Sequence, residues 1–221
     1  MQSSRQIQGV RCFDRGLYLR ANGFERKSCM KVEIHRRRRV FDGFFKIDEA
    51  ELQYERFDGQ MSPVVKRLNF SRGDSVAAVV VNIDDRKVIL VNQFKFPAYE
   101  NGSGWITEVV AGMVEPGESP ETAVRREIRE ETGYETRRLE HISTFFVSPG
   151  GTSERIILFY AEVENAGRHG SGGGLVSEGE DIRLIELTPA EVREMLASKA
   201  FEDAKTILGL NWLEGRLQEG I

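Results

Sequence analysis

Long apolar runs are missing from this chain of 221 residues, of which 40% are hydrophobic and 30% charged. No stretch approaches the roughly 18 consecutive apolar residues that a membrane-spanning helix needs, and the amino-terminal stretch lacks the basic-then-apolar order of a signal peptide. These absences predict a cytoplasmic protein without membrane contact. The length suits one large domain, or one domain together with a smaller one.

Cysteine and histidine are also scarce. The two cysteines, Cys12 and Cys29, lie where a disulfide would fasten only a peripheral loop, so we expect free thiols. The three histidines are scattered and have no second type of ligand nearby, which argues against a transition-metal site: His35, His141 and His169.

An excess of positive charge is missing as well. The chain has 31 Lys+Arg against 35 Asp+Glu, a net charge of −4, which gives no overall attraction to nucleic acid. The run Arg36–Arg39 is a local exception, but alternate residues of a strand point to opposite faces, so these arginines would not form one continuous patch. We therefore predict no nucleic-acid partner.

The sequence pattern changes at Lys31. Residues 1–30 mix Gln, Ser, Arg and Gly without a sustained period, which predicts a weakly ordered extension. Short alternating stretches then follow, broken by Asp42-Gly43 and Asp58-Gly59, and predict antiparallel strands. We expect a small β-sheet region at 31–72 and a main domain at 73–221.

Strand and helix signals alternate in the main domain. Two apolar stretches, 75–83 and 87–94, predict a hairpin with a buried face. Further strands are predicted at 105–110, 142–147, 156–163 and 182–187, with a glycine-rich surface loop at 167–179. Helices are predicted from Ser119-Pro120 to Gly133, from Thr188-Pro189 to about Ser198, and from 203 to 217.

Three glutamates share one face of the first predicted helix. On a helix turning about 100° per residue, Glu127, Glu130 and Glu131 fall at relative angles of about 0°, 300° and 40°. Like charges at this spacing repel, so a cation is expected beside them, although a solvated acidic face is the alternative. Mg²⁺ suits such a cluster because it takes oxygen ligands from one or two carboxylates together with substrate phosphates.

The whole segment from Gly112 to Tyr134 fits the pattern G-x5-E-x7-R-E-U-x-E-E-x-G-U, in which U is aliphatic. This pattern is the Nudix box, and the chain resembles the Nudix hydrolase family. Tyr134 is the only departure, in place of the final aliphatic residue, and we expect it to be neutral for packing.

The resemblance implies an α/β/α sandwich with a mixed sheet, plus a small amino-terminal antiparallel β-sheet. It also implies two or three Mg²⁺ ions, or Mn²⁺, held by Ala111, Glu127, Glu131 and Glu130. In this resemblance Arg126 braces the glutamates by ion pairing, Glu118 orients the helix or adds an outer ligand, and Gly112 permits a tight loop.

The loop Ser148–Glu154 resembles the S-P-G-G-x-x-E loop of ADP-ribose pyrophosphatases and related nucleoside-diphosphate-sugar pyrophosphatases. The resemblance makes Glu154 the candidate general base, because a carboxylate beside the metals can take the proton of an attacking water. Arg126 and Glu130 are expected to take part in catalysis with it, and Gly151 to contact the substrate. The alternative for Glu154 is a surface charge paired with Arg155.

Other stretches resemble the same subgroup. Gln93–Tyr99 resembles a Q-F-R-x-x-x-Y stretch near the substrate phosphates, with Lys95 replacing an arginine and losing its bidentate fork. Glu108 lies on the strand that enters the box, and the resemblance implies that Lys95 and Glu108 contact the substrate. Gly172–Ile182 resembles a G-G-G-x-x-x-E-x-E-x-I stretch, with a flexible loop as the alternative. The amino-terminal region resembles a sheet exchanged across a homodimer, which makes Arg67 a candidate substrate contact.

These features predict a metal-dependent hydrolase that cleaves ADP-ribose into AMP and ribose 5-phosphate. GDP-mannose or a UDP-sugar is the alternative substrate, because the glycine-rich stretch favours it. A non-catalytic sensor of nucleotide sugars is a weaker alternative, since such modules commonly have an eroded box. A hydrolase of RNA caps or mutagenic nucleotides is disfavoured by the sugar-type loops.

Overall fold

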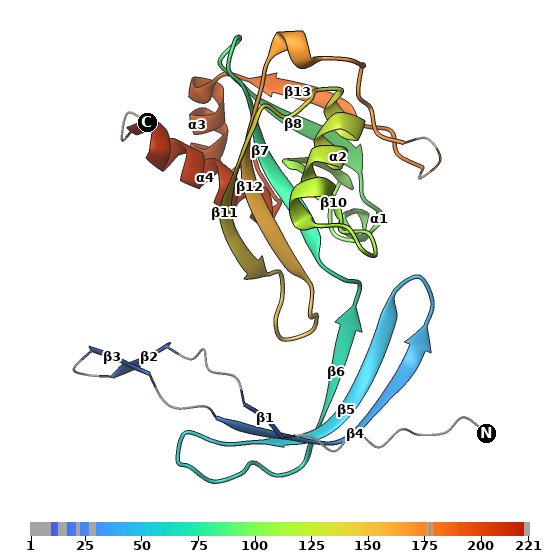
Figure 1. The fold of residues 1–221 in the computed structure, drawn as a ribbon, viewed down its shortest axis with the longest axis vertical. Helices are drawn as coiled ribbons and strands as arrows, with labels where there is room; N and C mark the ends of the chain where they lie inside the picture. Colours follow the sequence, from blue (N-terminus) through green and yellow to red (C-terminus); the bar gives the residue numbers. More distant parts are fainter. Residues whose placement is uncertain are drawn as a thin grey trace. The chain divides into compact units, whose positions relative to one another are not determined.

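The computed structural model describes residues 10–12, 17–20, 23–26, 30–175, 177 and 179–218. The chain divides into two compact units, one formed by Met1–Arg72 with Ser148–Glu154 and the other by Gly73–Val147 with Arg155–Ile221. Figure 1 shows the strands of the first unit in blue and cyan and the sheet and helices of the second in green to red.

The first unit is a four-stranded antiparallel sheet in the order β1-β4-β5-β6. Its long strands are β4 (Lys31–Asp42), β5 (Lys46–Tyr54) and β6 (Val65–Ser71), and each pairs with the next along the chain. Their alternating sequences and the Asp42-Gly43 turn carry the local signals for this meander.

Three short strands lie in the stretch predicted to be a weakly ordered extension: β1 (Val10–Cys12), β2 (Leu17–Arg20) and β3 (Gly23–Arg26). β1 pairs with β4, and β2 pairs with β3. The other residues before Met30 lie outside the described part of the chain, as do Cys29 and the side chain of Cys12, on which the prediction of free thiols depends.

The loop Ser148–Glu154 belongs to the first unit, whereas we predicted it as part of the main domain. The amide of Phe70 on β6 donates to the carbonyl of Gly151 at 2.9 Å, and the Thr152 hydroxyl donates to the carbonyl of Phe70 at 2.8 Å. These contacts join residues 81 and 82 positions apart, which no local pattern reveals.

The arginine run lies on β4 and alternates between the two faces of the sheet, as expected. Arg37 and Arg39 donate to the buried carboxylate of Asp48 on β5, at 2.7 and 3.0 Å, while Arg38 donates to Glu49 at 2.7 Å. Hydrogen bonds from Arg39 and Arg37 outweigh the burial of Asp48 and hold its pKa below the usual value. Arginines of this run therefore neutralise the negative charges of Asp48 and Glu49 on β5.

We expect Asp48→Asn to lower the free energy of unfolding by about 1 kcal/mol at pH 7, because two arginines lose their shared partner. A carboxyl with a lowered pKa stabilises the fold above its unfolded pKa of about 3.9, and this contribution disappears as the pH falls through the folded value. Urea unfolding of both proteins between pH 2.5 and 7 measures this difference. A difference that persists unchanged at pH 2.5 would contradict the expectation.

The second unit is built on a mixed sheet in the order β11-β12-β7-β8-β13, in which β12 runs parallel to β7 and the other neighbours on this path are antiparallel. These five strands are β7 (Ser75–Asn82), β8 (Lys87–Phe94), β11 (Arg138–Phe146), β12 (Arg155–Val163) and β13 (Arg183–Leu187). β7 and β8 form the predicted hairpin, and their buried side chains lie at the centre of the core.

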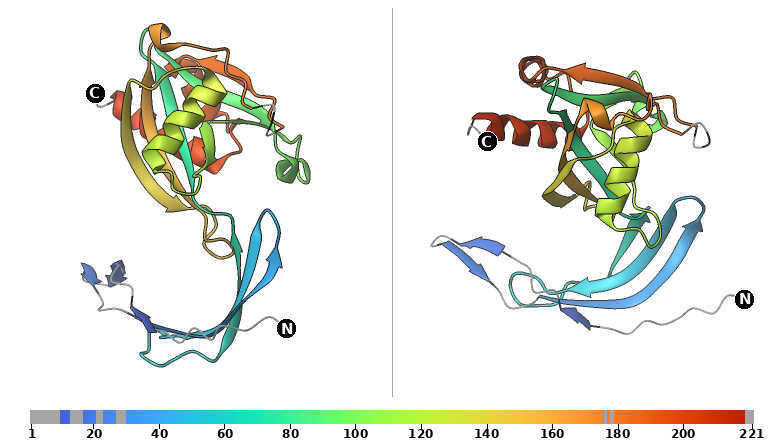
Figure 2. Two further views of the ribbon diagram at one scale, coloured as in Figure 1. Left: turned by 45° about the vertical axis from the view of Figure 1, so that its right-hand side comes forward. Right: turned by 45° about the horizontal axis from the view of Figure 1, so that its top comes forward.

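Side chains of β7 alternate between two cores on opposite faces of this sheet. One core joins Val76, Ala78 and Val80 to α2 (Pro120–Thr132). The other joins Ala77 and Val79 to α3 (Pro189–Ala197) and α4 (Ala204–Gln218). Figures 1 and 2 show α2 over one face and α3 and α4 over the other. The predicted α/β/α sandwich is confirmed.

The strand predicted at residues 105–110 is two strands. β9 (Trp105–Glu108) pairs with β8, whereas β10 (Val110–Met113) pairs with β7. The chain changes neighbour at Val109, whose amide donates to the hydroxyl of Thr206 at 2.9 Å. A short helix, α1 (Phe96–Tyr99), and a 3-10 turn, η1 (Asn165–Gly167), were not predicted.

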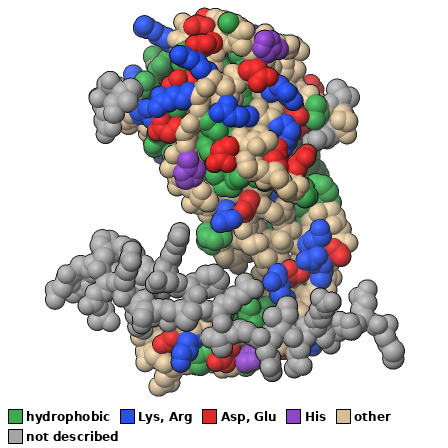
Figure 3. Space-filling view, viewed as in Figure 1, with side chains coloured by type: hydrophobic (Ala, Val, Ile, Leu, Met, Phe, Trp, Pro, Cys, Tyr) green, Lys and Arg blue, Asp and Glu red, His purple; other side chains and the backbone are tan. Residues whose placement is uncertain are grey.

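Among the described residues, no helix is long and apolar enough to span a membrane. On the face of the second unit shown in Figure 3, basic and acidic side chains are interspersed.

Candidate active site

Local sequence signals set the ends of α2, the helix that carries the three glutamates. The Ser119 hydroxyl accepts a hydrogen bond from the amide of Thr122 at 3.2 Å, and Pro120 opens the helix. Gly133 closes it with φ of 78°, a conformation that glycine adopts without strain. Ala123, Val124 and Ile128 are buried against the sheet, which fixes the direction of the glutamate face.

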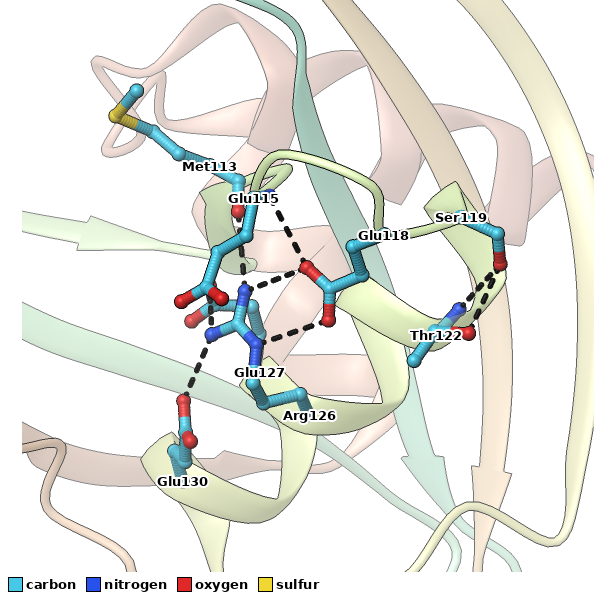
Figure 4. Close-up of polar contacts among 8 residues, drawn as sticks. All are labelled: Met113, Glu115, Glu118, Ser119, Thr122, Arg126, Glu127 and Glu130. Atoms are coloured by element: carbon cyan, nitrogen blue, oxygen red, sulfur yellow. Dashed lines mark hydrogen bonds and ion pairs between the residues drawn. The ribbon is translucent and has the colours of Figure 1, made fainter.

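Arg126 holds the carboxylates of the box together (Figure 4). It donates to both oxygens of Glu118 at 3.2 Å, to Glu127 at 2.8 Å and to Glu130 at 3.0 Å, and also to the carbonyl of Met113 at 3.1 Å. Its hydrogen bonds lower the pKa of Glu118 despite the burial of that carboxyl. One guanidinium thus fixes the loop before α2 to the helix.

Glu127 lies against Gly112 on β10. A Cβ atom at residue 112 would approach the Glu127 carboxylate to 1.9 Å, so a side chain there would displace it. Burial raises the pKa of Glu127 to about 7, although the charge of Arg126 acts in the opposite direction. The close approach gives a physical reason for glycine at residue 112.

Glu131 is the most deeply buried carboxylate of the site, with 1% of its surface exposed. Neither of its oxygens accepts a hydrogen bond from the described residues. Burial raises its pKa well above the usual value, and the negative charges of Glu127, Glu108 and Glu180 raise it further. Burying a carboxylate without a partner costs several kcal/mol. A cation bound to Glu131 would offset this unfavourable free energy.

Glu127 and Glu131 therefore fit a divalent ion such as Mg²⁺, which is commonly held by one or two carboxylates with substrate phosphates and water. The described residues contain no group of three or more acidic, His or Cys side chains already arranged to hold a metal. Arg126 donates to one oxygen of Glu127 and to one of Glu130. Ala111, the other predicted ligand, lies on β10 opposite Ala77 of β7.

Lys95 and Glu108, both predicted as substrate contacts, lie next to each other. Lys95 is 42% exposed, and its ammonium is 3.5 Å from Oε1 of Glu108. Glu108 is 5% exposed and also contacts Gln93 and the buried Lys205. Glu108 thus already has three donors, and the sequence had not drawn attention to Lys205. The only local signal was a lysine in the first turn of a helix, where it opposes the helix dipole.

The glycine-rich stretch, predicted as a surface loop, is an irregular segment that docks on the carboxyl-terminal end of α2. The amide of Gly173 donates to the carbonyl of Glu131 at 2.9 Å, and that of Gly174 to the carbonyl of Glu130 at 3.2 Å. A Cβ atom at Gly172 would lie 2.3 Å from the Glu131 carbonyl. The charge of Glu180, further along, raises the pKa of both Glu127 and Glu131, so this stretch contributes to the site.

The remaining predicted site residues belong to the first unit. Arg67 is exposed on β6, and its guanidinium donates to the carbonyl of Lys66 at 2.9 Å. Gly151 pairs with β6 as described above, and Glu154 lies 3.5 Å from Arg72. Arg155, the alternative partner of Glu154, instead pairs with Asp74. The roles of Arg67, Gly151 and Glu154 remain predictions.

Fold and site together define an α/β/α protein whose loop and helix present a buried pair of carboxylates braced by one arginine. A family model described as the NUDIX domain matches residues 71–208, more than half of the 221 residues. The chain belongs to the NUDIX domain family.

The curated relatives include the ADP-ribose pyrophosphatase of Escherichia coli K12, which is 37% identical over 186 residues, covering 83% of this chain and 88% of the relative. The GDP-mannose pyrophosphatase of Cronobacter sakazakii is 33% identical over 189 residues, which are 85% of this chain and 97% of the relative. A crystal structure of an ADP compounds hydrolase has a TM-score of 0.63 at 20% identity over 83% of this chain and 94% of its own. That structure supports the fold.

Proposed function

We propose that the protein hydrolyses the diphosphate of ADP-ribose to AMP and ribose 5-phosphate, with Mg²⁺ or Mn²⁺ as its metal. The observation that carries the proposal is the pair Glu127 and Glu131, two desolvated carboxylates on one helix face, of which Glu131 lacks a donor among the described residues. ADP-ribose is favoured over GDP-mannose because curated ADP-ribose pyrophosphatases reach 37% identity and the GDP-mannose pyrophosphatases 33% and 34%.

The mechanism divides the work among named side chains. Glu127 and Glu131 would hold the ion, with Glu130 and the Ala111 carbonyl as further ligands, and two or three ions are part of the proposal. When bound, such ions offset the charge that develops on the diphosphate oxygens and lower the pKa of a coordinated water. Arg126 keeps the carboxylates in place.

The chemical step adds one water across the P–O–P linkage. Glu154 takes a proton from the attacking water, the new P–O bond forms, and the bridging oxygen leaves with the other phosphate. Lys95 contacts the substrate phosphates with its exposed ammonium, and Arg67 and Gly151 are further proposed substrate contacts. Water supplies every atom that the two products gain.

The proposal is tested by nucleotide release from ADP-ribose, GDP-mannose and UDP-glucose, each with 5 mM Mg²⁺ or with a chelator. We expect Mg²⁺-dependent release of AMP, with kcat/KM for ADP-ribose on the order of tenfold above the other two, since a few polar contacts to the base are worth about that much. Higher activity on GDP-mannose would show that GDP-mannose, and not ADP-ribose, is the preferred substrate. Binding without turnover of any substrate would favour a non-catalytic sensor of nucleotide sugars.

Glu154→Gln should lower kcat about a hundredfold or more while KM changes little, because a general base acts in the chemical step. Glu180→Gln is the matched comparison, since Glu180 is also a loop carboxylate and lines a cavity with Lys95, a predicted substrate contact. Steady-state kinetics on ADP-ribose at several pH values measure both. If Glu154→Gln kept near-native turnover and Glu180→Gln lost it, Glu154 would not be the general base, and Glu180 of the glycine-rich stretch would be the candidate.

We also propose a homodimer that exchanges the amino-terminal sheet, which fits the exposed apolar side chains of the first unit: Val40, Phe41, Phe44, Val64 and Leu68. Light scattering during size-exclusion chromatography measures the mass, and a monomer at micromolar concentration would contradict the proposal. A cytoplasmic location and the lack of a nucleic-acid partner remain predictions from the sequence.

A further inference from the structure

Lys205 is a buried lysine that helix stability alone does not explain. It is the second residue of α4, where a positive charge opposes the helix dipole, and only 11% of its side chain is exposed. Burial lowers the pKa of Lys205, but the charges of Glu108 and Asp203 outweigh this effect and leave the pKa raised. The lysine is therefore held as a cation by these two carboxylates.

Glu108 connects this buried lysine to an exposed one. Its Oε2 contacts the ammonium of Lys205, whereas its Oε1 lies 3.5 Å from the ammonium of Lys95 and 3.4 Å from the amide nitrogen of Gln93. The two oxygens of one carboxylate are thus divided between two lysines. Asp203 supplies a second contact to Lys205, at 2.9 Å.

The first turn of α4 is fixed to the strands that enter the box. The Asp203 carboxylate accepts from the amide and the hydroxyl of Thr206, at 2.9 and 2.6 Å. The Thr206 hydroxyl oxygen in turn accepts from the amide of Val109, between β9 and β10. Lys205 is therefore presented to Glu108 by a braced element, and we expect little freedom for it to follow a moving partner.

Lys95 lines a cavity of about 270 Å³. Its lining includes Gln93, Trp105, Glu180 and Asp181. The charges of two of the lining residues, Lys95 and Glu180, act on the buried carboxyl of Glu131 on α2. We therefore expect the Lys95 ammonium to attract a phosphate group bound at these carboxylates, because its charge already acts on Glu131.

We propose that Lys205 is a positioning residue: it occupies Glu108, so that the ammonium of Lys95 stays available to a substrate phosphate. Glu108 and Asp203 carry two negative charges and the two lysines carry two positive ones. Without Lys205 the cluster has an excess negative charge, and both oxygens of Glu108 turn to Lys95. The inference rests on the proposed function, since it assigns Lys95 to the diphosphate.

The experiment compares Lys205→Met, Lys205→Arg and the double variant Glu108→Gln/Lys205→Met with the wild type. The measurements are kcat and KM for ADP-ribose, together with the Kd of its α,β-methylene analogue, which is not cleaved at the diphosphate. Arg193→Met is the control, because it also breaks an ion pair to α4, with Glu214 at 2.8 Å, on a part of the helix outside this cluster.

Lys205→Met should raise KM and Kd on the order of tenfold, with a much smaller change in kcat. Lys205→Arg should retain most of the affinity, and the double variant should return KM to within about threefold of the wild type, because it removes the carboxylate that captures Lys95. The Arg193 control should leave KM unchanged.

A Lys205→Met protein with native KM and Kd would overturn the inference, as would a double variant as weak as the single one. A lower melting temperature and a smaller active fraction with unchanged KM would show a merely structural role. If the wild type itself fails to cleave ADP-ribose, the proposed function fails, and the same variants assayed on GDP-mannose then decide the role of Lys205.

Discussion

Glu127→Gln is expected to lower kcat/KM for ADP-ribose by about a thousandfold, because the loss of one metal-holding carboxylate costs several kcal/mol of transition-state stabilisation. The amide has nearly the same shape, and Gly112 still leaves room for it. Turnover at saturating Mg²⁺ and ADP-ribose measures the effect. The amide also accepts fewer charge-assisted hydrogen bonds from Arg126, so the bracing of the loop should weaken slightly.

Glu121→Gln is the matched control for this substitution. Glu121 lies on the same helix, is exposed, and loses the same charge, so only its modest interaction with the helix dipole should change. We expect its activity to stay within about twofold of the wild type. Near-native turnover of Glu127→Gln would remove Glu127 from the proposed metal site.

Glu131→Gln is expected to have opposite effects on stability and activity. Activity should be lost as completely as in Glu127→Gln. In the presence of a chelator, however, the variant should be more stable by on the order of 2 kcal/mol, because it no longer buries a carboxyl whose pKa burial raises. For a chain of this size, that corresponds to a melting temperature about 4 to 8 °C higher.

Calorimetry at pH 8 with and without Mg²⁺ measures the melting temperatures of the wild type and of Glu131→Gln. The wild type should gain stability from Mg²⁺ by binding linkage, and the variant should gain much less. Glu130→Gln is the comparison, because Glu130 is paired with Arg126 at 3.0 Å and its loss should not raise the melting temperature of the chelated protein. A lower melting temperature of Glu131→Gln in chelator would show that this carboxylate has a stabilising partner in the folded protein.

The elements that local signals specify agreed closely with the structure. Ser119, Pro120 and Gly133 placed both ends of α2, because capping and backbone preferences act within a few residues. The same holds for the hairpin of β7 and β8 and for the start of α3 at Thr188. The spacing of Glu127, Glu130 and Glu131 also placed them near one another through helix geometry alone.

Local signals failed where the chain changes neighbours. The strand expected at 105–110 divides at Val109 because its two halves pair with different strands, β8 and β7. The glycine-rich stretch reads as a loop, yet its amides bind the carbonyls at the end of α2. Glycine is required there because the stretch approaches the end of α2, some 40 residues earlier in the sequence, too closely for a side chain to fit.

The sequence by itself determined the family resemblance, the helix that carries the glutamates and the charge that gathers on its face, since these depend on one continuous segment, Gly112 to Tyr134. Tertiary structure alone decided that Glu131 is buried without a donor among the described residues, that Arg126 also binds the carbonyl of Met113, and that Lys205 meets Glu108 across 97 positions. The physical reason is that burial and ion pairing depend on the summed desolvation and charge of groups that only folding brings together.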